Sequence, residues 1–97
     1  MQVSFAPAAV QDVEEIGDYI YAENPAAATR FIAELQMRCG RIANAPDSGR
    51  PRPELSPGLR SLPFRRYLIF YSTNDNEVRI ERVLHGSRDI HAIFDDI

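Results

Sequence analysis

The sequence predicts one α+β domain over residues 1–97: a short N-terminal strand, an antiparallel two-helix hairpin, a three-stranded antiparallel meander and a short C-terminal helix. Three observations predict this fold. The chain has 97 residues, 44% of them hydrophobic, which suffices for one core and leaves no room for a second domain. Apolar residues recur at helical spacing in the first half and at strand spacing in the second. A stretch rich in proline and glycine separates the two halves.

The first half predicts a strand and a helix. Gln2–Phe5 can form a short strand, and Pro7 suits the first turn of a helix because its ring fixes φ near the helical value. Tyr19 and Tyr21 are expected to flank the buried stripe of this helix. That stripe would consist of Val10, Val13, Ile16, Gly17 and Ile20.

A second helix follows after a short connection. Asn24 can cap it, Pro25 can occupy its first position, and Ala45 with Pro46 ends it. The connection is short, so the two helices are expected to pack as an antiparallel hairpin. The buried stripe of the second helix would be Ala28, Phe31, Ile32, Leu35, Cys39 and Ile42.

The second half predicts a loop, three strands and a closing helix. Residues 46–58 are crowded with turn-forming residues, and the segments 59–64, 67–73 and 78–85 are strand-like. Pro63 has no amide donor, so its strand is expected at a sheet edge. Gly86 ends the last strand, and residues 88–94 can form a short helix.

Strict alternation in the last strand places Val78, Ile80, Arg82 and Leu84 on one face, and Arg79, Glu81, Val83 and His85 on the other. If the first of these faces lies under the helices, Arg82 needs a partner, because a buried unpaired charge is very costly. An ion pair with Glu14, Glu15 or Glu34 is therefore expected.

The charge pattern favours a specific docking surface. The net charge is −3 and every one of the 11 basic residues is an arginine. Five arginines lie between Arg50 and Arg66, with only Glu54 opposing them. A protein that binds nucleic acid directly would carry a stronger overall basic bias, so sequence-specific nucleic-acid binding is not expected.

Other features point to a cytoplasmic protein without a cofactor. The single cysteine, Cys39, cannot form an internal disulfide and falls on a helical apolar stripe, which favours a core thiol in a reducing compartment. No apolar run reaches the ~18 residues of a membrane span, and the N-terminus lacks the pattern of a signal peptide. No metal site or phosphate-binding loop is expected, since His85 and His91 have no ligand set around them.

Several short sequence stretches, in this order along the chain, resemble the RelE/ParE toxin superfamily and its ParE branch in particular. They begin with Asn24-Pro25-Ala26-Ala27-Ala28 and Arg30-Phe31, and continue with Gly49-Arg50-Pro51-Arg52-Pro53-Glu54-Leu55. Gly58-Leu59-Arg60-Ser61, Tyr67-Leu68-Ile69-Phe70-Tyr71 and Arg82-Val83-Leu84-His85-Gly86-Ser87-Arg88-Asp89 complete the set. The resemblance implies a toxin held inactive by a cognate, ParD-like antitoxin, which wraps it with an extended or helical segment.

The superfamily divides by chemistry, and the resemblance favours the branch that binds. RelE-like members cleave messenger RNA in the ribosome with arginine, lysine and often tyrosine side chains. Here lysine is absent, Leu68 stands where such enzymes tend to have a catalytic arginine, and Phe94 stands near the position of the tyrosine. ParE-like members are thought to inhibit DNA gyrase by binding it. We therefore expect a gyrase inhibitor, with no catalytic residues. The alternatives are a ribosome-dependent endoribonuclease using Arg60, His85 and Arg88, and a non-toxic antitoxin-binding partner.

The expected gyrase-binding residues are Arg60, Arg65, Arg66, His85, Arg88 and Asp89. Arg60, Arg65 and Arg66 can equally be a solvated hairpin tip, and their functional reading is a contact with gyrase or with acidic residues of the antitoxin. For His85, Arg88 and Asp89, one reading is a remnant active site; the other, which we favour, is structural, with Asp89 capping the last helix or pairing with Arg88 and His85 hydrogen-bonded at a strand end. The expected antitoxin contacts lie on the helical hairpin, at Val13, Ile16, Ile20, Phe31 and Leu35.

Overall fold

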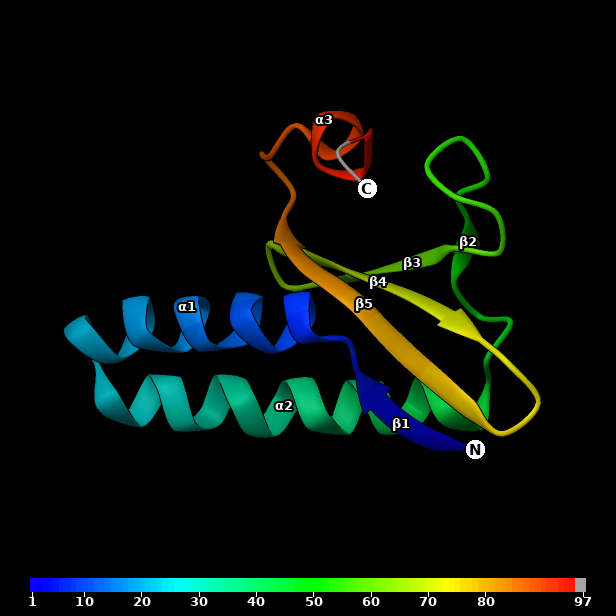
Figure 1. Ribbon diagram of the computed structural model, residues 1–97. Coiled ribbons are helices and arrows are strands. Elements are labelled where there is room, and N and C mark those ends of the chain that lie inside the picture. The colour runs from blue at the N-terminus through cyan, green and yellow to red at the C-terminus, as the bar shows by residue number, and fades with distance from the viewer. Residues whose placement is uncertain (96–97) are drawn as a thin grey trace.

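The computed structural model describes residues 1–95, and within them the predicted α+β order is confirmed (Figure 1). Residues 96 and 97, which the expected single domain includes, lie outside the described residues. The elements in chain order are β1 (Gln2–Phe5), α1 (Pro7–Glu23), α2 (Pro25–Asn44), β2 (Arg50–Pro51), β3 (Arg60–Phe64), β4 (Tyr67–Thr73), β5 (Glu77–His85) and α3 (Ile90–Asp95). No helix among residues 1–95 is long and apolar enough to cross a membrane.

The sheet is larger than the predicted three-stranded meander. It has five strands in the order β1-β5-β4-β3-β2, with β1 parallel to β5 and the other pairs antiparallel. The meander itself is present as β3, β4 and β5. The two added strands are short and pair with distant segments, and β2 lies inside the expected loop. The N-terminal strand was predicted, but its parallel pairing with β5 was not, and β2 was not predicted at all, because local periodicity reveals neither pairing.

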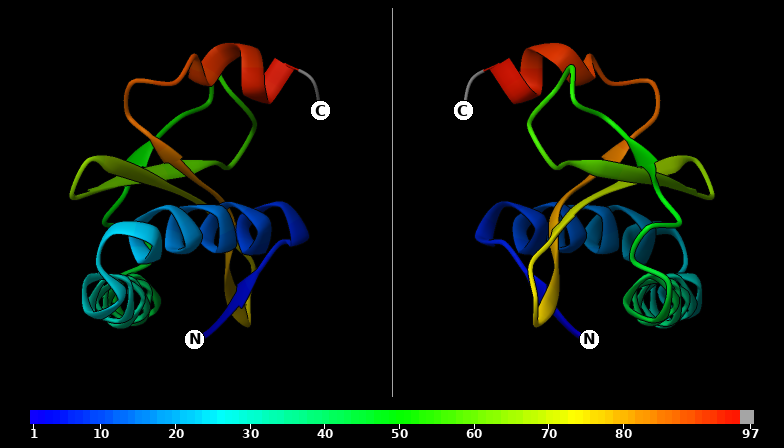
Figure 2. Two further views of the ribbon diagram at one scale, coloured as in Figure 1. Left: turned by 90° about the vertical axis from the view of Figure 1, so that its left-hand side faces the viewer. Right: turned by 90° about the vertical axis from the view of Figure 1, so that its right-hand side faces the viewer.

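The two long helices form the expected antiparallel hairpin and cover one face of the sheet (Figure 2). Pro7 begins α1, and the Asn24 side chain caps α2 by accepting a 3.1 Å hydrogen bond from the Ala27 amide. The core between helices and sheet contains Phe31, Leu35 and Cys39 from α2 and Ile69 and Tyr71 from β4. Cys39 is 2% exposed, which confirms it as a core thiol.

A β-bulge in β5 overturns the predicted alternation of its faces. Tyr71 pairs with Ile80 and Phe70 with Arg82, so Glu81 is an extra residue on β5. Beyond this point the side chains exchange faces. Val83 therefore joins Val78 and Ile80 in the core beneath the helices, and Leu84 lies in the core on the opposite face.

The opposite face of the sheet has a second, smaller apolar core. It packs the strand residues Phe70 and Leu84 against Phe94 of α3, with the Phe70 and Phe94 rings 5.0 Å apart. The loop before β3 closes it from the side with Leu55 and Leu59. Both faces of the sheet are thus covered, and α3 is held by its apolar side.

The expected ion pair of Arg82 with the helical hairpin is present, but its partner is Asp12. The Arg82 guanidinium donates to the Asp12 carboxylate from Nε at 2.7 Å and from Nη2 at 2.8 Å. Asp12 Oδ2 also accepts the Val83 backbone N–H at 3.0 Å. These hydrogen bonds raise the pKa of Arg82 above its usual range. Glu14, Glu15 and Glu34 are exposed, and none of them forms a salt bridge with Arg82 within residues 1–95.

Replacing Asp12 by alanine should lower the free energy of unfolding by about 2–4 kcal/mol, because Arg82 and the Val83 amide would both lose their acceptor. The urea midpoint should fall with an unchanged slope. Glu15→Ala is the matched control on the same helix, and an equal loss in both variants would contradict this role of Asp12.

Cys39 should be inert toward thiol reagents in the folded protein. Burial raises the pKa of its thiol to about 11, so the thiolate is scarce at pH 8. The folded state then holds its proton where the unfolded thiol loses it, so this contribution to stability is present below pH ~9 and declines as the pH rises toward 11. Iodoacetamide labelling with and without urea checks this; rapid native labelling at pH 8 would contradict it.

Candidate binding surface

One end of the sheet gathers polar and aromatic side chains from three elements. The Arg66 carbonyl, in the β3–β4 turn, accepts the Gly86 amide at 2.9 Å, and Tyr67 pairs with His85 across β4 and β5. Between this end and α1 lies a hollow of about 210 Å³, here called the junction depression. Its lining residues are Asp12, Glu15, Ile16, Tyr19, Tyr67, Val83, His85 and Arg88.

The hydrogen bonds that the structural reading expects of His85 and Asp89 are present. His85 Nδ1 accepts the Ser87 backbone N–H at 3.1 Å and lies 2.7 Å from the Ser87 hydroxyl, while its ring packs edge-on against Tyr67. Because Nδ1 is an acceptor, the neutral ring carries its proton on Nε2. Asp89 Oδ1 accepts the Ala92 amide at 3.2 Å and so caps α3. No ion pair joins Asp89 to Arg88 within residues 1–95.

The six expected target-binding residues do not form one surface. His85, Arg88, Asp89 and Arg66 lie at the junction end, and Arg66 and Arg88 are exposed. Arg65 instead pairs with Glu34 of α2 and stacks over Phe31 and Phe64, with its φ of 53° in the left-handed region. Arg60 begins β3 at the opposite end of the strand, about 16 Å from Arg65 at the usual rise per residue.

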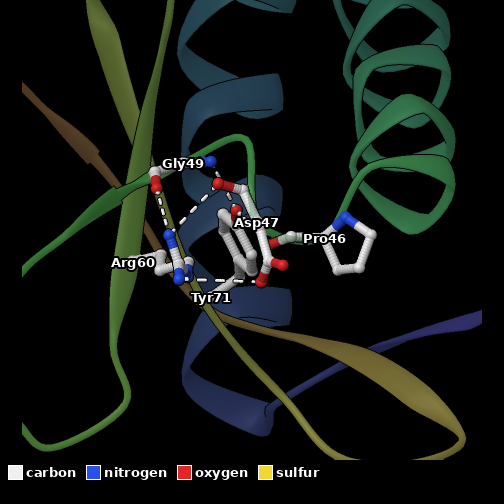
Figure 3. Close-up of polar contacts among 5 residues, drawn as sticks. All are labelled: Pro46, Asp47, Gly49, Arg60 and Tyr71. Carbon is white, nitrogen blue, oxygen red and sulfur yellow. Dashed lines mark hydrogen bonds and ion pairs between the residues drawn. The ribbon is translucent and has the colours of Figure 1, made fainter.

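Arg60 belongs to a cluster that fastens the loop after α2 (Figure 3). Its Nη1 donates to the carbonyls of Asp47, at 3.1 Å, and Gly49, at 2.8 Å. The buried Tyr71 hydroxyl accepts the Gly49 amide at 2.8 Å and donates to the Pro46 carbonyl at 2.8 Å. Sequence reasoning missed Tyr71 and Gly49 as partners. The available signal was that Gly49 begins one, and Tyr71 ends another, of the stretches that resemble the toxin superfamily.

The expected antitoxin contacts divide between interior and surface. Phe31 and Leu35 are 2% and 1% exposed, so both belong to the core, although Leu35 also lines a hollow between the helices. Ile16 lines the junction depression, Val13 lines a different hollow, and Ile20 is half-buried against the core.

A groove runs along the outer seam of the two helices, here called the hairpin groove. It consists of two hollows that share Ile32 and Gln36. The hollow of about 210 Å³ is also lined by Phe5, Val10, Val13, Glu14 and Leu35. The hollow of about 480 Å³ is also lined by Gly17, Asp18, Tyr21, Ala28, Thr29 and Ala33.

Two tyrosines of α1 stand out from the surface. Tyr19 and Tyr21 are 72% and 61% exposed, so the expectation that they flank a buried stripe was wrong. Two helix positions apart correspond to a rotation of about 200° around the helix axis. Tyr19 therefore lines the junction depression, and Tyr21 lines the hairpin groove on the other side of α1. Helix α1 thus presents a different surface on each side. Residues 1–95 contain no cluster of three or more side chains suited to a metal ion.

Gly49→Ala should destabilise the protein by about 1–3 kcal/mol, because the added Cβ would lie 2.4 Å from the Tyr71 hydroxyl. Tyr71→Phe should cost a similar amount by leaving the buried Gly49 amide without an acceptor. Gly40→Ala is the control: its Cβ meets no atom within 4 Å, and helix propensity should make it more stable by about 0.5–1 kcal/mol. Thermal unfolding of the three variants checks the order, and a neutral Gly49→Ala would contradict the close packing.

Comparison with known proteins places the chain in a family. A family model described as "ParE toxin of type II toxin-antitoxin system, parDE" matches residues 3–90. No curated protein matches at a significant level. Among solved structures, a chain of the "Chromosomal ParDE TA system from P. aeruginosa" has a TM-score of 0.74 at 19% identity, over 88% of this chain and 95% of that chain. That likeness shows a shared fold, and the family match spans most of the chain. The protein therefore belongs to the ParE toxin family of type II toxin–antitoxin systems.

Proposed function

We propose that this protein is a cytoplasmic toxin that inhibits DNA gyrase by binding it, and that a ParD-like antitoxin neutralises it. The observation that carries the binding mechanism is the packing of Leu68 and Phe94. RelE-like nucleases are expected to place catalytic side chains at or near these positions. Here both residues pack in the second apolar core, and Phe94 is only 7% exposed. Hydrocarbon side chains cannot move a proton or stabilise a phosphate.

The contacts of Arg60 argue against the alternative of an endoribonuclease. That alternative relies on Arg60, His85 or Arg88 to carry cleavage, and a site that uses all of them would bring them to one phosphodiester. Arg60 is committed to the carbonyls of Asp47 and Gly49 and begins β3 at the end away from the junction. Reacting groups must lie within hydrogen-bond reach of one another or of a shared atom, so the separation of Arg60 from His85 and Arg88 argues against a nuclease site that uses all three.

The junction depression is the proposed gyrase-binding surface. Arg66 and Arg88 are exposed beside it and make no ion pair within residues 1–95. A guanidinium pairs with carboxylates in a bidentate manner, so acidic side chains of the target suit both arginines. Tyr19 adds a large exposed aromatic side chain, the type that dominates the binding energy of many interfaces.

The hairpin groove is the proposed antitoxin-binding surface. It lies on the side of α1 away from the depression, and apolar residues such as Val10 and Ile32 line it. Val10 is 43% exposed although it is aliphatic. An antitoxin segment that covers the groove would remove this apolar area from water.

Charge reversal at the junction should weaken the inhibition of gyrase. Arg66→Glu and Arg88→Glu would repel acidic side chains, so we expect each to raise the inhibitory concentration in a plasmid supercoiling assay at least tenfold, about 1.4 kcal/mol of binding. Arg30→Glu is the control, because Arg30 is exposed on α2 and is not among the residues that line the junction depression or the hairpin groove.

Three results would contradict parts of the proposal. Wild-type protein that leaves supercoiling unchanged at large excess would exclude gyrase as the target. Cleaved transcripts in a translating extract, lost in Arg88→Ala, would support the endoribonuclease. Unimpaired growth of cells that express the chain without antitoxin would identify a partner that is not toxic.

A further inference from the structure

A cavity on the α3 side of the sheet, here called the sheet cavity, takes no part in the proposed function. Its volume is about 620 Å³, which exceeds that of the junction depression and of either hollow of the hairpin groove. Among the described residues it shares no lining side chain with those hollows. Hollows of roughly 300–1,000 Å³ with apolar walls and a few converging polar groups are typical sites for small molecules.

Three segments that are distant in sequence form the apolar walls of the sheet cavity. The start of α1 contributes Pro7 and Ala8, the loop before β3 contributes Leu55 and Leu59, and α3 contributes Phe94. Figure 1 shows α3 and this loop on the side of the sheet away from the helical hairpin. Leu55, Leu59 and Phe94 also belong to the second apolar core, so this part of the wall is packed in place before any ligand arrives.

The bulge in β5 brings the polar groups of the sheet cavity together. Arg79, Glu81 and Arg82 of β5 all line it, with Ser72 of β4 beside them. In a regular strand Arg82 would point to the opposite face from Arg79 and Glu81. Because Glu81 is an extra residue, Arg82 turns to their face instead. Two guanidinium groups of one strand therefore reach the same cavity.

The hydrogen-bonding capacity left at this cavity consists of donors. Both oxygens of Glu81 already accept a hydrogen bond, Oε2 from the Ser72 hydroxyl at 2.7 Å and Oε1 from Arg79 Nε at 3.4 Å. Arg82 uses Nε and Nη2 on Asp12. Within residues 1–95, Nη1 of Arg82 and both terminal nitrogens of Arg79 make no hydrogen bond. Guanidinium donors of this kind pair with carboxylate and phosphate oxygens.

The start of α1 favours the same sign of charge. Its N-cap residue, Ala6, provides no capping side chain, and the first turn contains no acidic residue. The first helical hydrogen bond runs from the Val10 amide to the Ala6 carbonyl, so the amides of Ala8 and Ala9 precede it. The positive end of the helix dipole thus lies at the wall of the cavity, beside the two arginines.

We propose that the sheet cavity binds a small organic anion, a carboxylate or phosphate carried on an apolar body. The anionic group lies toward Arg79 and Arg82, and the apolar body packs against the wall that includes Phe94. This binding goes beyond the proposed function, because it requires neither gyrase nor an antitoxin. The ligand adds a hydrogen bond to the guanidinium that already holds Asp12, so the site adjoins the contact that fixes α1.

A titration with matched probes tests the preference for an anion. Hexanoate, hexanol and hexylammonium share one apolar body and differ in the head group, and amide chemical shifts of the full chain report where each binds. We expect hexanoate to shift the Ser72, Glu81 and Phe94 amides with a dissociation constant of about 1 mM. Hexanol should bind at least about tenfold more weakly, and hexylammonium should not bind. Hexyl phosphate in place of hexanoate then shows which anionic head group suits the arginines better.

Three results of the titration would overturn the proposal. They are hexanol that binds as tightly as hexanoate, a preference for hexylammonium, and the absence of shifts at the cavity with both anions. None of these measurements involves gyrase or an antitoxin, so their failure leaves the proposed function standing.

Arg79→Gln tests the head-group contact while keeping a polar side chain. Arg79 is exposed, and its ion pair within residues 1–95 is with Glu81, so the variant should fold. We expect hexanoate to bind at least about fivefold more weakly and hexanol to bind as before. Arg30→Gln, an exposed control on α2, should leave both affinities unchanged. An equal loss for hexanoate and hexanol, or no loss for either, would contradict the role of Arg79.

Nuclear Overhauser contacts of hexanoate with the wild-type protein locate the apolar body without any substitution. Contacts from the hexanoate chain to the Phe94 ring and the Leu59 methyl groups are expected. Contacts to Val10 and Ile32 instead would place the probe in the hairpin groove and overturn the inference.

Discussion

The fold depends on how β5 is supported where the chain leaves the sheet. Strand β1 pairs with β5 only as far as Ile80, because the chain then turns into α1. Beyond that point the outer backbone groups of β5 would have no partner. The Asp12 carboxylate fills this place, accepting the Val83 amide and pairing with Arg82. A buried acid on a helix thus substitutes for a missing strand, and it fixes α1 against the part of β5 that carries His85.

The bulge at Glu81 and the contacts of Asp12 with Arg82 and Val83 lie on the same part of β5 and act together. Without the extra residue, strict alternation would turn Val83 away from the helices and Leu84 toward them. With it, each face of the sheet receives an apolar side chain, so the helical hairpin and α3 can pack on opposite faces.

Most arginines of the segment 50–66 also stabilise the fold internally. Arg52 bonds to Glu54, whose pKa it lowers, and Arg60 and Arg65 are also paired, leaving few of its cations for a partner.

The features that the sequence predicted are those encoded by local pattern. Pro7, Asn24 and the helical stripes specify the hairpin, and alternation specifies the meander. The features that it missed depend on contacts distant in sequence: the pairing of β1 with β5, the bulge, and the choice of Asp12 over Glu14 or Glu15. The prediction of surface residues was the least accurate. Phe31 and Leu35 were expected at an interface because an apolar stripe does not reveal whether it meets the sheet or a partner.

Helix α1 links the two proposed surfaces, which constrains how neutralisation can work. Val13 and Tyr21 line the hairpin groove, and Ile16 and Tyr19 line the junction depression on the other side of the helix. A shift of α1 could in principle transmit antitoxin binding to the depression. However, Asp12 ties the helix to Arg82 and Val83, and moving it would separate a buried ion pair at a cost of several kcal/mol. An antitoxin that acts on this protein is therefore expected to cover the depression with its own chain, reaching it from the groove, instead of displacing α1.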